Sequence, residues 1–165
     1  MLFSSLFTTI LAVIVFYKLV KKFNLSTSPF LLSCFFLFLP ARWLVVRSVG
    51  SPEPLFIFAI LASLYFFKDK KYWLAGILGA LAQITKTPGI LLFISYSIYL
   101  IWQSIKSVDT KSCYSRILCF KQTLLPAFPL LLIPFSIIPV FFFYELQTGD
   151  FFAYFHSGDN FHLVF

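Results

Sequence analysis

Charged residues are scarce in this sequence, and acidic residues are the scarcest of them. Asp, Glu, Lys and Arg make up 12% of the 165 residues, and only six residues are acidic. A soluble domain carries about 25% charged residues, so the composition argues against one. Histidine and cysteine are also rare, and none of them has the spacing of a zinc site. We therefore expect no resident metal ion and no other cofactor.

The motifs of soluble nucleotide enzymes are missing as well. The sequence contains no Walker motif, no nucleophile elbow and no Rossmann fingerprint. A net charge of +7 would suggest a nucleic-acid partner in a soluble protein. Here the lysines and arginines lie between apolar runs, a distribution that membrane topology explains better. We therefore expect no nucleic-acid partner.

Long hydrophobic runs dominate what the sequence does contain. Hydrophobic residues make up 60% of the chain, and the mean hydropathy is +0.92. Runs of roughly 20 apolar residues recur, and as helices they would cross about 30 Å of hydrocarbon. The predicted fold class is all-α, a polytopic transmembrane helical bundle of six spans over residues 2–20, 29–46, 54–67, 72–85, 89–102 and 123–144. Four prolines interrupt the last run, which predicts a broken helix there.

Basic residues are distributed unevenly between the connections. If the first connection is cytoplasmic, ten of the 13 lysines and arginines fall on the cytoplasmic side and three on the outer side. This is the positive-inside pattern. Both histidines and four of the six acidic residues then fall on the outer side. The outer face therefore holds most of the residues that could carry chemistry.

No soluble domain or linker is visible in the sequence. We treat residues 1–165 as a single transmembrane domain. Six spans would leave both termini outside, and the last residues, HLVF, form no polar tail. We therefore expect the chain to be a fragment of a larger protein.

The functional argument starts from residues 47–89. Two apolar runs in this stretch share a basic turn at residues 68–71, and their far ends carry polar segments with proline and glycine. A hairpin of two helices would bring these segments, which hold Glu53 and Lys86, to one membrane face. Glu53 could then act as a ligand or general base, and Lys86 could bind phosphate. The plain alternatives are a helix-start acid and a helix-end cation, each favourable to the helix dipole.

Other polar residues on the outer side extend this candidate site. Arg42 and Arg47 carry guanidinium groups that match phosphate oxygens, or they anchor the membrane interface. His156 and Asp159 are three residues apart, so in a helix they would share a face as an acid–base pair or half a metal site. Acids and aromatics near Asp150 also suit sugar binding, and the alternative is an interfacial helix with an aromatic belt.

Small residues recur in the predicted helix at 72–85. Gly76, Gly79 and Ala82 follow one another at intervals of three. Such spacing allows the backbones of neighbouring helices to approach closely. We expect a packing role for these residues, and no direct role in a site.

Four short motifs occur in order along the chain: SPEP at residues 51–54, WLAG at 73–76, TKTPG at 85–89 and GDFFAYFH at 149–156. Together, over about residues 30–156, they resemble the membrane core of GT-C glycosyltransferases. The closest resemblance is to PIG-V-type GPI mannosyltransferases and their bacterial relatives. This sequence differs from the family's pattern in two ways. Lys86 stands where the family has an arginine, and no aspartate-bearing outer loop follows the first span.

This resemblance implies an enzyme that moves a sugar from a polyprenyl-phosphate donor to a glycan or lipid acceptor on the outer or lumenal membrane face. The expected catalytic residues are Glu53, Asp150 and His156, and the expected substrate-binding residues are Arg47, Lys86 and Asp159. The expected location is the bacterial plasma membrane, with the endoplasmic reticulum membrane as the alternative. Two other functions stay open: a transporter or flippase-like module for an anionic lipid, and a non-catalytic membrane subunit.

Overall fold

The computed structural model describes residues 2–38, 51–106, 125–149 and 151. Every regular element within these residues is helical, as the sequence predicts, and no strand occurs among them. The elements are α1 (Leu2–Phe23), α2 (Pro29–Phe38), α4 (Glu53–Lys68), α5 (Tyr72–Thr85), η1 (Thr87–Gly89), α6 (Ile90–Lys106), η2 (Leu125–Leu131), α8 (Leu132–Phe135) and α9 (Ile137–Thr148).

Three helical stretches of the described chain are long and apolar enough to cross a membrane. They are Phe3–Phe23, Thr87–Lys106 and Ala127–Thr148. The last one comprises parts of η2, α8 and α9, so its proline-rich sequence changes helix type along its length as expected. α2 and α5 are shorter apolar helices, and the rest of the predicted second span lies outside the described residues. The three long stretches are compatible with an integral membrane protein.

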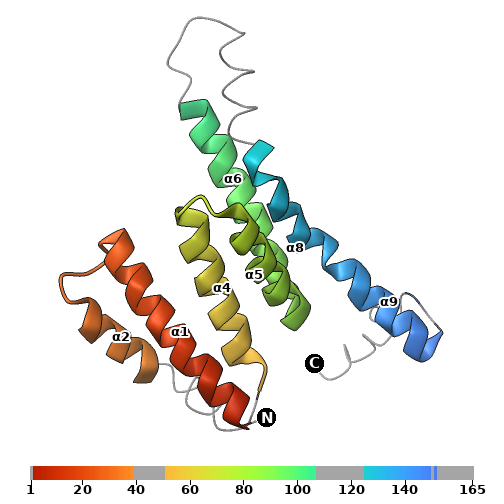
Figure 1. Cartoon of the computed structure of the whole chain (residues 1–165), viewed down its shortest axis with the longest axis horizontal. Coiled ribbons are helices and arrows are strands. Elements are labelled where there is room, and N and C mark those ends of the chain that lie inside the picture. Colours follow the sequence, from red (N-terminus) through yellow and green to blue (C-terminus); the bar gives the residue numbers. More distant parts are fainter. Residues whose placement is uncertain (1, 39–50, 107–124, 150, 152–165) are drawn as a thin grey trace, which may run out of the picture.

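The predicted hairpin is formed by α4 and α5, which run antiparallel on either side of the basic turn (Figure 1). Lys70 in this turn has a φ of 58°, in the left-handed region that a tight reversal requires. Ser63 of α4 donates a hydrogen bond of 2.8 Å to the carbonyl oxygen of Ala75 in α5. Its hydroxyl also lies 2.7 Å from the hydroxyl of Tyr96 in α6. One buried serine therefore connects three helices.

Small residues let η2 and α8 approach α5 closely. A Cβ atom on Gly76 would lie 2.3 Å from the carbonyl oxygen of Pro129, and one on Gly79 would lie 2.5 Å from Cδ1 of Ile133. Ala82 continues the same spacing and is fully buried. The prediction that these small residues serve helix packing is therefore confirmed.

α1 and α4 run in the same direction, and their C-terminal ends lie side by side. Lys22 of α1 forms an ion pair with Asp69, and its ammonium donates a hydrogen bond of 3.3 Å to the carbonyl oxygen of Tyr65. The same ammonium lies 4.0 Å from the centre of the Tyr65 ring, a cation–π contact. α2 turns back along α1, with the rings of Phe16 and Phe36 stacked at 4.3 Å.

The charges of these helices divide between two ends of the molecule. The basic end carries Lys22 and the turn at residues 68–71, and the Glu53 end carries Glu53 and Lys86. α6 leads the chain back to the basic end, and α8 and α9 run towards the Glu53 end beside α5 (Figure 1). The side of a membrane that each end faces stays a prediction.

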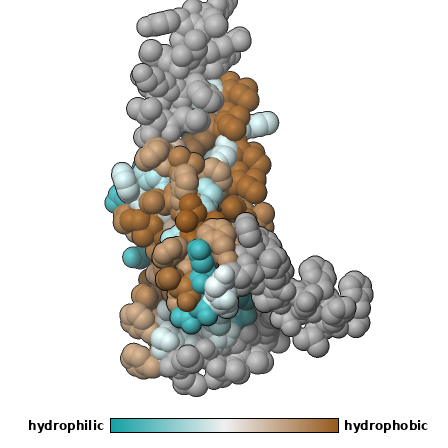
Figure 2. Space-filling view, turned by 90° about the vertical axis from the view of Figure 1, so that its right-hand side faces the viewer, coloured by the Kyte–Doolittle hydropathy of each residue, from teal (hydrophilic) through white to brown (hydrophobic). Residues whose placement is uncertain are grey.

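Large apolar side chains cover much of the outer surface. Exposed examples occur on α1, α2, α5, α6 and α9, among them Phe3, Trp73, Ile98, Trp102 and Leu146. Figure 2 shows extensive hydrophobic surface on the face it presents, with hydrophilic residues gathered in the lower part of the view. Contiguous apolar surface of this kind is suited to contact with lipid or with further protein.

Candidate functional site

Glu53 is the first residue of α4 and lies within its first turn. Glu53 lies between two prolines, and a following proline disfavours helical dihedral angles, yet the helix begins at this residue. Proline is tolerated in a first turn, because the N–H group it lacks would have no acceptor within the helix. Pro52 is the N-cap with helical dihedral angles, and Pro54 is fully buried. The two prolines therefore fix where the carboxylate emerges.

Lys86 lies at the point where α5 ends. Its backbone is extended, with φ −152° and ψ 135°, and Pro88 and Gly89 follow in the η1 turn. The chain reverses tightly here, since a Cβ atom on Gly89 would lie 2.5 Å from Cα of Gln83. Only glycine permits this approach. The extended backbone directs the Lys86 side chain sideways, towards the start of α4.

The two residues meet in an ion pair. Nζ of Lys86 donates a hydrogen bond of 2.6 Å to Oε1 of Glu53, although the residues are 33 positions apart. The lysine side chain is 33% exposed and the carboxylate side chain 21% exposed. Both charges are thus half-buried, where a pair interacts more strongly than on an open surface. The structure brings together the two residues that the hairpin argument selected.

A pocket of about 350 Å³ lies on the other side of the η1 turn, between the end of α5 and α9. One part of its lining is polar and the other is apolar or aromatic; the lining residues are Gln83, Ile84, Thr85, Lys86, Thr87, Pro88, Ile137, Val140, Phe141 and Tyr144. Its volume lies in the range of small-molecule sites, which is about 300–1,000 Å³. The pocket is therefore amphipathic and large enough for a sugar ring.

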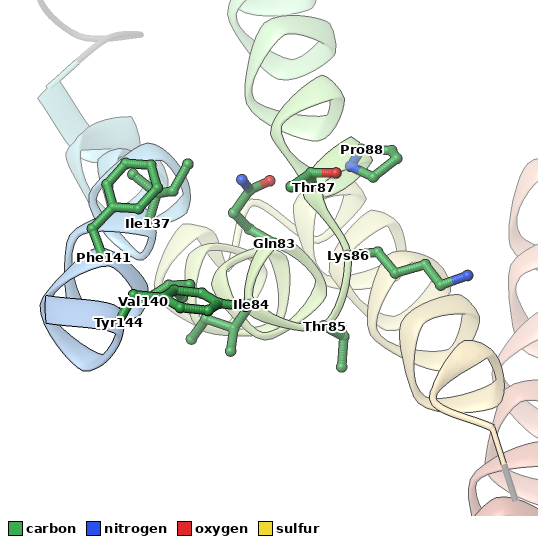
Figure 3. A pocket seen from close by; sticks show the side chains of 10 residues that line it. All are labelled: Gln83, Ile84, Thr85, Lys86, Thr87, Pro88, Ile137, Val140, Phe141 and Tyr144. Carbon is green, nitrogen blue, oxygen red and sulfur yellow. The ribbon is translucent and has the colours of Figure 1, made fainter. Parts of the chain in front are cut away.

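The ion pair and the pocket lie back to back. Figure 3 shows the Lys86 ammonium directed away from Gln83 and towards α4, so only the rest of the residue borders the pocket. Glu53 is not among the lining residues. Glu53 and Lys86 are therefore neighbours, but the described pocket borders Lys86 and not Glu53, because the turn of the chain separates Glu53 from it.

Gln83 is the polar group that the sequence argument missed. Its side chain is 5% exposed and borders the pocket, and its Oε1 atom has no hydrogen-bond partner within the part of the chain that the structure describes. An unpaired buried amide oxygen is costly, so such groups often mark a binding site. A glutamine inside an otherwise apolar run was the available signal, since polar residues in such runs tend to be functional.

The remaining predicted site residues lie outside the described residues. These are Arg47, Asp150, His156 and Asp159, and Arg42 with them. Phe151, which lies within the motif at residues 149–156, is described. The centre of its ring lies 5.5 Å from that of Phe141, which borders the pocket. Gly149, the first residue of the same motif, has a φ of 71° and is the C-cap of α9.

Comparisons with known proteins add no relative. No protein-family model matches the chain, and neither a curated protein nor a solved structure matches it. The resemblance to GT-C glycosyltransferases therefore stays a hypothesis that depends on the motifs alone.

Proposed function

We propose that the chain forms part of the membrane core of a lipid-linked glycosyltransferase with a six-span, GT-C-like bundle. It would transfer a sugar such as mannose from a polyprenyl-phosphate donor to a hydroxyl group of a glycan or lipid acceptor. The observation that carries the proposal is the half-buried Glu53–Lys86 ion pair beside an amphipathic pocket. A carboxylate and a cation placed together at one end of a helical hairpin can divide the work of proton transfer and phosphate binding.

The donor has the same two chemical parts as the site. Its phosphate is an anion that Lys86 can bind, and its sugar and first isoprene units suit the polar and apolar parts of the pocket wall. The Lys86 side chain has four rotatable carbon–carbon bonds, so it can exchange Glu53 for a phosphate on the pocket side of the turn. That exchange would release the Glu53 carboxylate from its ion pair at the moment when the donor is in place.

The released carboxylate would then act as a general base. It takes the proton of an acceptor hydroxyl that approaches from the α4 side of the η1 turn. The acceptor oxygen attacks the anomeric carbon, which the phosphate bound to Lys86 would hold beside that turn. The bond between that carbon and the phosphate oxygen breaks, and polyprenyl phosphate leaves with its charge stabilised by Lys86. General-base assistance of this kind contributes about 10²- to 10⁴-fold in rate.

The other proposed roles complete the same site. The Gln83 amide would hydrogen-bond sugar hydroxyls, and Tyr144 and Phe141 offer aromatic faces to the ring. Arg47 and Asp159 are proposed as further substrate-binding residues, and Asp150 and His156 as further catalytic residues, on the strength of the motifs. The proposed location is the bacterial plasma membrane, with the endoplasmic reticulum membrane as the alternative.

The test is sugar transfer in membranes from cells that express the chain. Polyprenyl-phosphate mannose with a labelled sugar serves as donor, and membranes from cells with an empty vector give the background. We expect Glu53→Gln to lower the rate at least about 100-fold. The control is Glu145→Gln, which removes an exposed carboxylate of α9 and should leave the rate within about twofold.

Two results would overturn the proposal. One is transfer no faster than the vector background. The other is a Glu53→Gln rate equal to that of the control variant. Movement of a labelled anionic lipid across vesicles that contain the purified chain, without sugar transfer, would instead identify the transporter alternative.

A further inference from the structure

A second pocket, of about 470 Å³, lies at the basic end of the molecule. Glu53 is at the opposite end of α4. The lining residues of the pocket come mainly from the end of α4, the turn that follows it, and α6. Leu64, Phe67, Lys68 and Lys70 line it from the hairpin side, and Tyr99 and Gln103 from α6. None of these residues has a part in the proposed sugar-transfer site.

The inner part of this pocket is an aromatic wall. The rings of Phe67 and Tyr96 are stacked with their centres 4.0 Å apart and an angle of 9° between them, and the rings of Phe67 and Tyr99 pack edge to face with their centres 5.6 Å apart. Tyr96 is held in place by its hydrogen bond of 2.7 Å with Ser63. With Leu64, these rings form an ordered apolar surface that fits a hydrocarbon chain better than a soluble anion.

The mouth of the pocket is positively charged. Lys68 and Lys70 are both exposed there. The nearest acid in sequence, Asp69, is already paired with Lys22, and no described carboxylate forms an ion pair with either lysine. The ammonium of Lys68 lies 4.9 Å from the centre of the Phe23 ring, a cation–π contact. The two ammonium groups are therefore available for an anion.

An exposed apolar surface continues from this mouth along α6. Ile98, Trp102 and Ile105 are 62%, 67% and 68% exposed. If α6 spans the membrane, Ile98 faces the acyl region, and a lipid chain can reach the pocket sideways from the bilayer. A tyrosine and a tryptophan near the mouth, Tyr99 and Trp102, are the residue types found at the level of lipid headgroups.

We propose that this pocket binds an anionic phospholipid, with its phosphate between Lys68 and Lys70 and the start of one acyl chain against Phe67 and Leu64. Cations at the mouth and an apolar wall inside match the two halves of such a lipid. The proposal requires the protein to be in a membrane, but it does not depend on sugar transfer. Failure of one proposal therefore leaves the other standing.

The experiment measures lipid binding to the full chain, purified in neutral detergent, by native mass spectrometry. The probes are phosphatidylglycerol and phosphatidylcholine with identical acyl chains. We expect phosphatidylglycerol to bind more tightly, and Lys68→Gln/Lys70→Gln to weaken it about 30-fold. The matched control is Lys18→Gln/Lys21→Gln, which removes two exposed lysines of α1 that do not line the pocket and should change binding less than about threefold.

A second variant tests the cavity without changing charge. Ser95 borders the pocket, and among the residues that the structure describes its hydroxyl bonds only to the Leu91 carbonyl oxygen of its own helix, at 2.8 Å. Ser95→Phe should fill the pocket and weaken phosphatidylglycerol binding at least about tenfold while the protein stays folded by circular dichroism.

Three outcomes would overturn the proposal. The first is equal weakening in the two double-lysine variants, which would mean that the charge of this end attracts lipid without a site. The second is full binding by Ser95→Phe. The third is displacement of the lipid by millimolar glycerol 3-phosphate, which would identify a site for a soluble phosphate and not for a lipid.

Discussion

Replacement of Gly76 by alanine tests the packing that holds α5 in place. The added methyl carbon would lie 2.3 Å from the carbonyl oxygen of Pro129 and 2.9 Å from its carbonyl carbon, whereas ordinary contact begins at 3.4 Å. α5 and η2 would therefore have to separate by about 1 Å, with a loss of dispersion contacts along the interface. Both obstructing atoms belong to the backbone, so no change of rotamer can relieve the clash.

The magnitude follows from two opposing effects. Overpacking of this kind costs roughly 1–3 kcal/mol, and the upper part of that range applies because the backbone must move. The higher helix propensity of alanine returns up to about 1 kcal/mol. We expect Gly76→Ala to lower the free energy of unfolding by about 2 kcal/mol, which is about 30-fold in the unfolding equilibrium constant.

Gly79→Ala is the matched control, since it makes the same chemical change one helical turn away. Its methyl carbon would meet Cδ1 and Cγ1 of the buried Ile133 at 2.5 and 2.8 Å, so one side chain must shift but no backbone has to move. We expect this variant to be destabilised less than Gly76→Ala, by about 1 kcal/mol.

The assay is reversible unfolding in mixed micelles titrated with sodium dodecyl sulfate, followed by far-ultraviolet circular dichroism. If Gly79→Ala proved as destabilising as Gly76→Ala, or if Gly76→Ala had no effect, the reasoning about backbone contact would be refuted.

Two further predictions concern the helical core and the topology. Ser63→Ala should destabilise the protein by about 2 kcal/mol, because it leaves the buried hydroxyl of Tyr96 without its described partner. In the same unfolding titration the control Ser95→Ala, at an exposed site, should change the free energy of unfolding little. Equal effects of the two substitutions would contradict this reasoning. Cysteines placed at Ser51 and at Lys70 should react with a membrane-impermeant maleimide from opposite sides of the membrane, and labelling of both from one side would contradict the two-ended arrangement of charges.

The elements that the sequence predicted well are those with local causes. α5 covers residues 72–85 as expected, because a basic turn precedes it and Pro88 prevents its continuation. The Glu53–Lys86 pair was also predictable, since a short turn between two apolar runs forces an antiparallel hairpin. The hairpin brings its far ends together whatever the rest of the chain does.

Contacts between distant segments were not predictable in this way. The ion pair between Lys22 and Asp69 depends on α1 lying parallel to α4, and nothing in either sequence selects that neighbour. The pocket beside Gln83 likewise needs α9 to cross the end of α5. Hydropathy indicates that such helices exist, but side-chain fit decides which of them touch.

A single substitution cannot show whether the ion pair serves the chemistry or only the structure, because loss of either charge would disturb folding and chemistry together. Breaking a half-buried ion pair leaves one charge without its partner. The free energy lost is larger than for an exposed pair and smaller than for a fully buried pair. Exchange of the two residues, Glu53→Lys with Lys86→Glu, keeps both charges and their pairing while it moves the carboxylate to the end of α5.

The most direct test of the central claim is therefore the sugar-transfer rate of this exchanged variant, measured beside its stability and beside the two single substitutions. If Glu53 and Lys86 form a functional site, the exchange should recover part of the stability that each single substitution loses, because the ion pair is restored while each charge now opposes the dipole of its helix. Its transfer rate should nevertheless stay at least about 100-fold below that of the wild type, because the base is in the wrong place. Recovery of both stability and transfer would contradict the claim, and would show that the pair only ties α4 to α5.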